Sequence, residues 1–321
     1  MAAVVADEGI DQGVAWHYGD PMREQREIEA GHGLVDLSHR GVLTVTGPDR
    51  LSWLHSLTTQ HLTELAPGVG TTALVLSGSQ GHIQHTLYGV DDGETFWAHT
   101  EPGKVAELVG FLDSMRFMLR VEVTDRSDEF GIVWSAAADD IPDSVLSRTA
   151  ADALGGVDLF VPRTQLDQLL ATGPAAGTWA YEARRIAAGV PRVGVDTDER
   201  TIPNEIGVLG TAVHLNKGCY PGQETVGRVQ ALGRPPRRLV RLQLDGSVDA
   251  LPDVGAAVLL GERKIGRMGS SARHFEEGPI GLALIKRNTP TDADLIVDGI
   301  AAAQEVLVDP EIGQHFRPNW G

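Results

Sequence analysis

The sequence predicts an α+β protein whose C-terminal part is a small antiparallel β-barrel. In residues 1–236 helical and strand patterns interleave, but hairpin turns join the strands, which is not typical of a doubly wound parallel sheet. Residues 237–308 consist of short alternating runs broken by turns, as in a barrel or sandwich. Because the two parts differ in their predicted secondary-structure pattern, we expect a domain boundary near residue 236, with two subdomains in 1–236 and the barrel domain in 237–321.

Hydrophobic periodicity and turn residues locate the elements of the larger part. Helices are predicted at 21–29, from 51 to 57, within 101–115, at 164–171 and at 179–188. Strands are predicted at 42–46, 73–76, 83–90, 96–99, 120–124, 131–135 and 157–161. Gly78-Ser79-Gln80-Gly81 and Asp91-Asp92-Gly93 are strong hairpin turns. Residues 136–156, rich in Ala, Asp and Gly, indicate a loop or a subdomain seam.

The C-terminal part follows an irregular stretch at 196–210, which carries the chain to a segment of breakers and polar residues at 215–228. Barrel strands are then predicted at 239–244, 257–260, 264–269, 280–285 and 301–308.

Composition narrows the function classes. With 27 basic and 44 acidic residues the formal charge is −17, which opposes general adhesion to nucleic acid or anionic membranes. No run of about 18 apolar residues and no basic-then-apolar leader is present, so we expect a cytoplasmic protein without a membrane partner. The single cysteine excludes an internal disulfide and cannot supply the thiolates of a permanently bound iron–sulfur cluster. No phosphate-loop or dinucleotide-binding glycine motif occurs.

The segment 215–228 contains that cysteine, Cys219, between Lys217 and Tyr220. Glycine and proline interrupt any regular element here, so we expect Cys219 on a tight loop. One interpretation is a structural turn with a packed thiol. The other is a nucleophilic or redox-active thiol that forms a transient adduct, captures iron or a thiol, or senses oxidant. If the backbone is extended, Lys217 and Cys219 leave on the same face and the ammonium favours the thiolate.

Charged residues around this segment allow two interpretations each. Glu224 and Arg228, four apart, form an ion pair on a following helix or contact a ligand. Arginines at 228, 234, 237, 238 and 241 are solvated barrel surface or an anion site for a carboxylate tail, a phosphate or RNA. His82 and His85 are three apart on a predicted strand and point to opposite faces, so we expect no metal site.

The stretch Lys217-Gly218-Cys219-Tyr220-Pro221-Gly222-Gln223-Glu224-Thr225-Val226 resembles the signature of the YgfZ-type folate-binding proteins, relatives of the glycine cleavage T-protein (aminomethyltransferase). Weaker similarities lie in the same order at 33–38, at 185–191 and at 202–205, and the resemblance runs from about residue 31 to 308. It implies α+β subdomains and a C-terminal barrel around a folate-sized channel. It further implies a tetrahydrofolate-like cofactor and a role in assembly or repair of iron–sulfur clusters, including those of tRNA-modifying enzymes.

Residue by residue, the resemblance assigns the reactive centre to Cys219 with Lys217. It assigns the folate contacts to a set of polar side chains along 185–228, namely Arg185, Glu205, Tyr220, Gln223, Glu224 and Arg228.

Two positions depart from the aminomethyltransferase pattern. His85 and Thr86 stand where those enzymes carry acidic residues, one of them the catalytic aspartate, so we expect no glycine-cleavage activity. Ala187 stands where relatives often carry a pteridine-binding glutamate, which leaves Glu205 as a substitute or as a local cap. Two alternatives stay open: a tetrahydrofolate-dependent aminomethyltransferase or demethylase, and a non-enzymatic module for another anionic or aromatic ligand.

Overall fold

The computed structural model describes residues 3–137 and 145–312, and the chain forms two compact units. Unit 1 comprises Met1–Val75 and His85–Arg184, and unit 2 comprises Leu76–Gln84 and Arg185–Gly321. Unit 2 therefore includes the tip of one hairpin from the N-terminal part of the chain. Within the described ranges, no helix combines the length and the apolar character needed to cross a membrane.

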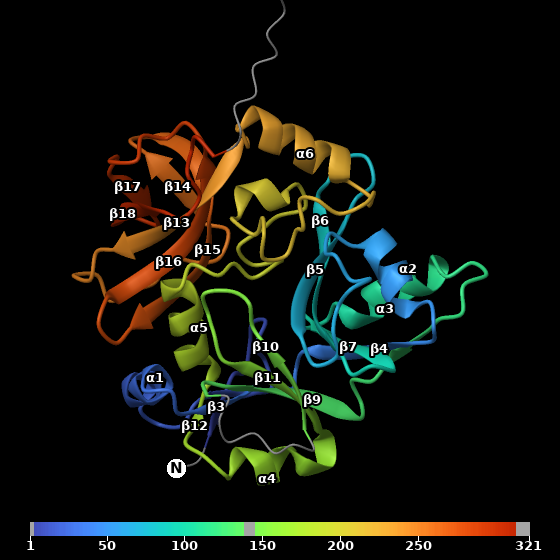
Figure 1. Ribbon diagram of the computed structural model, residues 1–321. Coiled ribbons are helices and arrows are strands. Elements are labelled where there is room, and N and C mark those ends of the chain that lie inside the picture. The colour runs from blue at the N-terminus through green and yellow to red at the C-terminus, as the bar shows by residue number, and fades with distance from the viewer. Residues whose placement is uncertain (1–2, 138–144, 313–321) are drawn as a thin grey trace, which may run out of the picture. The chain divides into compact units, whose positions relative to one another are not determined.

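The first sheet has five strands in the order β5-β6-β7-β4-β8 (Figure 1). The strands are β4 (Gly41–Thr46), β5 (Gly70–Leu76), β6 (Ile83–Asp91), β7 (Thr95–Thr100) and β8 (Glu122–Asp125). Helices α2 (Arg50–Leu57) and α3 (Val105–Ser114) pack on one face through buried leucines such as Leu54 and Leu108. Phe96 and Ala98 of β7 join this core, because alternate residues of a strand point to the same face.

The second sheet, also of five strands, lies in unit 1 and has the order β10-β11-β9-β3-β12. Its strands are β3 (Leu34–Asp36), β9 (Phe130–Ser135), β10 (Leu146–Thr149), β11 (Val157–Pro162) and β12 (Ala175–Ala176). Unit 1 also contains the small ladder of β1 (Val4–Val5) and β2 (Ala15–His17), and the helices α1 (Pro21–Glu29), η1 (Arg163–Gln165) and α4 (Leu166–Leu170). Helix α1 begins where the Asp20 side chain accepts the Arg23 N–H at 3.0 Å.

A buried polar layer joins the two sheets of unit 1. Asp158 of β11 accepts from Arg148 of β10 at 2.6 Å and lies 3.0 Å from the Nε2 atom of His99 of β7. Tyr88 of β6 stacks on His99 with ring centroids 4.9 Å apart. Because buried charges are costly unless they are paired, Arg148 and Asp158 fix the relative position of their strands.

Unit 2 contains a closed antiparallel barrel with the strand order β13-β16-β15-β14-β17-β18 (Figure 1). The strands are β13 (Arg237–Leu244), β14 (Ala257–Leu260), β15 (Arg263–His274), β16 (Gly278–Lys286), β17 (Leu295–Val297) and β18 (Ile300–Val306). Val240, Met268 and Ile285 are among the buried residues of its core. Before the barrel come η2 (Pro203–Glu205) and α6 (Gln223–Leu232), while α5 (Thr178–Ala187) crosses from one unit to the other.

The α+β class with a C-terminal antiparallel barrel is confirmed, and the helix predicted at 21–29 is α1. For 136–156 the sequence predicts a loop or a subdomain seam; the loop is wrong for Leu146–Thr149, which form β10, and positions 138–144 lie outside the described residues. The sequence of β10 lacks the apolar alternation of a strand, because its buried position holds Arg148, which pairs with Asp158. The first barrel strand begins at Arg237, but the larger segment of the unit that contains the barrel begins at Arg185. The domain boundary near residue 236 stays a prediction.

Candidate functional site

Cys219 lies in an irregular segment, residues 215–222, that we term the Cys219 loop. The segment turns at 215–216, bends at Lys217, and ends at Gly222, the residue that precedes helix α6. The Cys219 thiol is free and its side chain is exposed. Lys217 and Tyr220 on either side are buried, with 6% and 8% of their surface accessible. The loop therefore presents its thiol outward and anchors itself by the two neighbouring side chains.

The Lys217 amine packs on an aromatic ring. Its Nζ atom lies 4.9 Å from the centroid of the Tyr220 ring. Burial lowers the pKa of Lys217 to about 8 and raises the pKa of Tyr220 to about 12. The extended backbone that would place Lys217 and Cys219 on one face is not formed, because the chain bends at Lys217. The amine is turned inward while the thiol is exposed.

The turn between β5 and β6, residues 77–82, contacts the end of the Cys219 loop within unit 2. The Gly222 N–H donates to the Gly78 carbonyl at 3.0 Å, and the Thr225 hydroxyl donates to the Ser79 carbonyl at 3.4 Å. The turn itself closes through the Gly81 N–H and the Ser77 carbonyl at 3.0 Å. The turn is thus hydrogen-bonded to the junction between the Cys219 loop and α6, although the two segments are far apart in the sequence.

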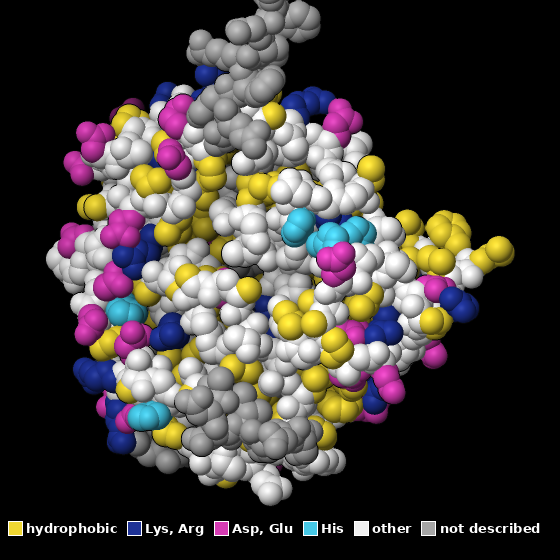
Figure 2. All heavy atoms as spheres, in the orientation of Figure 1, with side chains coloured by type: hydrophobic (Ala, Val, Ile, Leu, Met, Phe, Trp, Pro, Cys, Tyr) yellow, Lys and Arg dark blue, Asp and Glu magenta, His cyan; other side chains and the backbone are white. Residues whose placement is uncertain are grey.

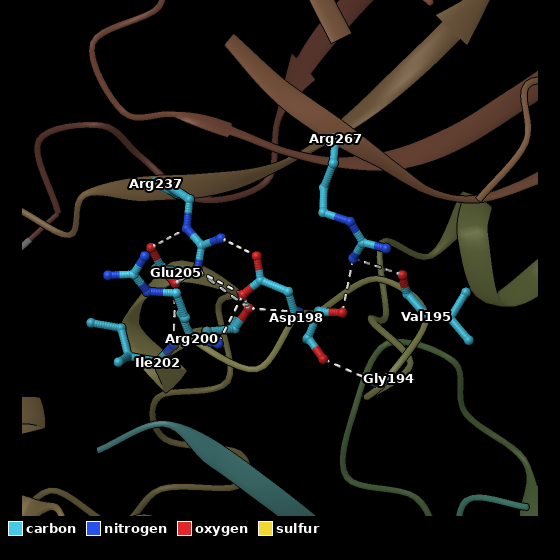
Figure 3. A network of polar contacts seen from close by, with 10 residues as sticks. Gly194, Val195, Asp198, Arg200, Ile202, Glu205, Arg237 and Arg267 are labelled. Atoms are coloured by element: carbon cyan, nitrogen blue, oxygen red, sulfur yellow. Dashed lines mark hydrogen bonds and ion pairs between the residues drawn. The ribbon is translucent and has the colours of Figure 1, made fainter. Parts of the chain in front are cut away.

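A network of ion pairs ties the stretch before the Cys219 loop to the barrel (Figure 3). Arg237 at the start of β13 contacts both oxygens of Glu205 at 2.8 Å and one oxygen of Asp198 at 2.6 Å. The second Glu205 oxygen also accepts the Ile202 N–H at 3.1 Å. Arg267 of β15 donates to the carbonyls of residues 195 and 197. Glu205 is fully buried, so its carboxylate is held in place by these partners.

Arg185 belongs to a second buried network of unit 2. Its guanidinium donates to Asp196 at 2.9 Å, to the Val190 carbonyl at 2.6 Å and to the Ser270 hydroxyl at 2.7 Å. Asp196 also accepts the backbone N–H of Ser270 and that of Arg192. The carboxylate therefore organises the stretch after α5 against strand β15.

Helix α6 carries the charge pair that the sequence allowed. Glu224 and Arg228 are 2.8 Å apart and both are exposed, which confirms the ion pair. Gln223 donates to the Lys217 carbonyl at 3.4 Å and ties the helix to the Cys219 loop.

Three of the arginines that follow α6, at 237, 238 and 241, have acidic, amide or carbonyl partners, whereas Arg234 is exposed. Arg237 pairs with Glu205 and Asp198, and Arg241 pairs with glutamates at 277 and 305. Arg238 is buried and donates to the carbonyls of residues 287 and 289 and to Gln304. These partners reduce the positive charge that this segment offers to an anion, so RNA contact stays only a prediction from sequence.

The two positions that depart from the aminomethyltransferase pattern lie on β6. His85 and Thr86 are both buried, and burial lowers the pKa of His85 although Glu107 opposes the shift. Across residues 3–137 and 145–312, no partner reaches His85 Nδ1 or the Thr86 hydroxyl. In the same ranges no group of three or more His, Cys, Asp or Glu side chains could hold a metal ion. These positions therefore supply neutral groups in place of carboxylates.

The structure gathers some of the sequence-predicted site residues and separates others. Lys217, Cys219, Tyr220 and Gln223 share the Cys219 loop and its junction with α6, whereas Glu205 and Arg185 belong to the two networks described above. The contribution of Gly78 and Gly81 was not predicted. Their signal in the sequence was a glycine at each end of a four-residue turn, which defined the hairpin but not its contact with Gly222.

The chain as a whole is similar to proteins of known sequence and structure. No family model matches the sequence. The chain is 24% identical to an aminomethyltransferase of Symbiobacterium thermophilum over 91% of its own length and 89% of that protein. It is 28% identical to an aminomethyltransferase of Mycobacterium bovis over 91% of its length and 85% of that protein.

The glycine cleavage system aminomethyltransferase T of Bartonella henselae has a similar structure, with a TM-score of 0.80 at 17% identity. That match covers 98% of this chain and 95% of the other. In sequence the chain is related to aminomethyltransferases, and its fold is that of a glycine cleavage T-protein.

Proposed function

We propose that this chain is a YgfZ-type folate-binding protein that supports assembly or repair of iron–sulfur clusters, including those of tRNA-modifying enzymes, with Cys219 as its reactive centre. The observation that carries the proposal is the exposed thiol on a loop whose neighbouring side chains are buried. One thiolate cannot hold a cluster, but an exposed one can donate a ligand to iron or a cluster carried by another protein. A cytoplasmic location and a tetrahydrofolate-like ligand belong to the same proposal.

The groups on β6 support this role over glycine cleavage. His85 and Thr86 are buried and bring no carboxylate to positions that, by resemblance, need one for acid–base chemistry. The neutral form of His85 is favoured by burial, so its ring does not replace a carboxylate as an anionic group.

Complementation of cells that lack the protein tests the proposal. We expect the native chain to restore the activity of iron–sulfur enzymes, and Cys219→Ser to fail although it folds. The matched control is Gly227→Ala on α6, where an added Cβ meets no atom within 4 Å, and it should restore activity like the native chain. Full restoration by Cys219→Ser would remove the thiol from the proposed function.

A tetrahydrofolate-dependent transferase is the second candidate, because the similarity to aminomethyltransferases extends over 91% of the chain. Turnover of an aminomethyl or N-methyl donor by the purified protein, retained in Cys219→Ala, would establish it. Calorimetric titration with tetrahydrofolate separates both candidates from a binding module for another anionic or aromatic ligand. In that last case no heat of folate binding is expected from either the native chain or Cys219→Ala.

A further inference from the structure

Two glycines meet where the β5–β6 turn contacts the end of the Cys219 loop. Gly81 and Gly222 have φ values of +68° and +83°, in the left-handed region that favours glycine. A Cβ on Gly222 would lie 2.9 Å from the Gly81 Cα and 3.0 Å from the Ser77 carbonyl oxygen. A Cβ on Gly81 would lie 3.1 Å from the Thr225 Cβ. At this close approach a side chain on Gly222 would clash with the backbone of the turn, and one on Gly81 would press on Thr225 and adopt a strained φ.

Hydrogen bonds close this contact into a ring of segments within unit 2. The Gly222 N–H donates to the Gly78 carbonyl on the turn. Where the turn enters β6, the Ile83 N–H donates to the Thr201 carbonyl at 2.9 Å. Within η2, the Asn204 side chain donates to the Val226 carbonyl of α6 at 3.2 Å. The turn, the segment around Thr201 and helix α6 therefore hold one another.

The Cys219 loop is irregular and combines two buried side chains, Lys217 and Tyr220, with exposed residues around the thiol. It contains no helix or strand, and Leu215 is 45% exposed, while Gly218 and Cys219 are also exposed. Segments with few buried contacts open locally unless their ends are held. The interior of the loop is held by the packing of Lys217 on Tyr220, and its C-terminal end is held by the Gly222 contact with the turn.

We propose that the β5–β6 turn is the positioning element of the Cys219 loop, and that Gly81 and Gly222 are its positioning residues. Their contact sets how freely the loop opens, so a change in the turn reaches the thiol although the two are far apart in the sequence. Because coupling is reciprocal, a group attached to Cys219 also changes the freedom of the turn. The consequence for thiol chemistry rests on the function proposed for Cys219; the mechanical coupling does not.

Hydrogen exchange tests the coupling directly. In Gly81→Ala we expect exchange of the Gly222 amide and of the amides of 215–220 to rise by about tenfold, the factor by which the left-handed region disfavours alanine. Gly222→Ala should raise exchange in residues 77–82 in return. Native-like exchange in the Cys219 loop of Gly81→Ala would overturn the proposal.

Two matched glycine variants separate crowding from other effects. Gly261→Ala introduces the same strain, at φ +59°, where nothing lies within 4 Å, and Gly227→Ala introduces neither strain nor crowding. Both should leave exchange in the Cys219 loop unchanged, and an equal rise in Gly261→Ala would reject the specific contact. Should Gly81→Ala not fold, Thr225→Val removes the hydroxyl bond to Ser79 and should still raise exchange in both segments. No rise in that variant would likewise count against the coupling.

Alkylation of Cys219 by iodoacetamide in the same variants connects the coupling to the thiol. We expect the rate in Gly81→Ala to move toward that of the urea-unfolded chain, while Gly261→Ala keeps the native rate. If the native thiol already reacts at the unfolded rate, activation of Cys219 is refuted, and hydrogen exchange alone decides the positioning role. Failure of the positioning role and failure of the thiol function proposed for Cys219 are thus distinguishable.

Discussion

Arg237 binds the Glu205 carboxylate through two parallel hydrogen bonds, from Nε to Oε1 and from Nη2 to Oε2, each 2.8 Å long. The Glu205 side chain is fully buried, and a third bond comes from the Ile202 N–H. Both oxygens of the residue proposed as a folate ligand are thus engaged within the protein. A pteridine ring would have to compete with a bidentate guanidinium, which is among the strongest partners of a carboxylate.

Arg237→Ala leaves the buried Glu205 carboxylate without its cation. We expect the free energy of unfolding, measured by urea denaturation, to fall by about 3–5 kcal/mol, because removing one member of a buried ion pair leaves the other charge buried without a partner. Arg228→Ala is the control, because the Arg228–Glu224 pair is exposed and should contribute less than about 1 kcal/mol. Similar losses in both variants would contradict the structural role of the buried pair.

Asp198 gives the protein an acid-sensitive contribution to stability. Burial opposes its ionisation, but hydrogen bonds from Arg237 and Thr201 outweigh burial and lower its pKa from 3.8 to about 2. Since the folded pKa is below the unfolded one, this contribution is complete above pH 3.8 and is lost as the pH falls toward 2. Urea titrations across this window should show a flatter pH dependence for Asp198→Asn than for the native chain. An identical slope in the two would refute the assignment.

Lys217 makes the stability of the protein depend on pH in the alkaline range. Burial lowers its pKa from 10.5 to about 8, so the unfolded chain binds the proton more tightly than the folded one. Stability should therefore rise with pH between about 8 and 10.5 as the unfolded chain loses that advantage. Lys217→Met should abolish this rise in chemical denaturation experiments. A rise that persists in the variant would have to come from another group.

Phe117 is held in a strained turn between α3 and β8. Its φ is +47°, and it is 85% exposed next to Met118, which is 96% exposed. Figure 2 shows hydrophobic side chains on the projection that Figure 1 places after α3. We expect Phe117→Gly to raise the free energy of unfolding by up to about 1 kcal/mol, because glycine adopts this conformation without the steric cost of a side chain.

Met118→Gly is the control for this turn. Its backbone is not in the left-handed region, so glycine relieves no strain there and should leave stability unchanged or lower. Thermal unfolding of the two variants measures the difference. A Phe117→Gly chain that unfolds below the native one would show that the turn is stabilised by contacts of the phenyl ring.

Local sequence patterns predict much of the fold. The turn at 78–81 and the alternation on either side of it predict a hairpin, and β5 and β6 form it. The four-residue spacing of Glu224 and Arg228 predicts their pair, because residues four apart on a helix are neighbours. The polar strand β10 escapes prediction, since the burial of Arg148 depends on a partner in another strand.

The sequence by itself determined the α+β class, five of the six barrel strands and the presence of one cysteine on an irregular segment, because these follow from short-range periodicity and from breaker residues; the three-residue strand β17 is too short to show a pattern. Only the tertiary structure decided that Lys217 turns inward while Cys219 stays exposed. Only it decided that Arg237 pairs with Glu205 and that Gly222 contacts the β5–β6 turn. These partners are distant in the sequence, and what selects them is the path of the chain, which no local pattern encodes.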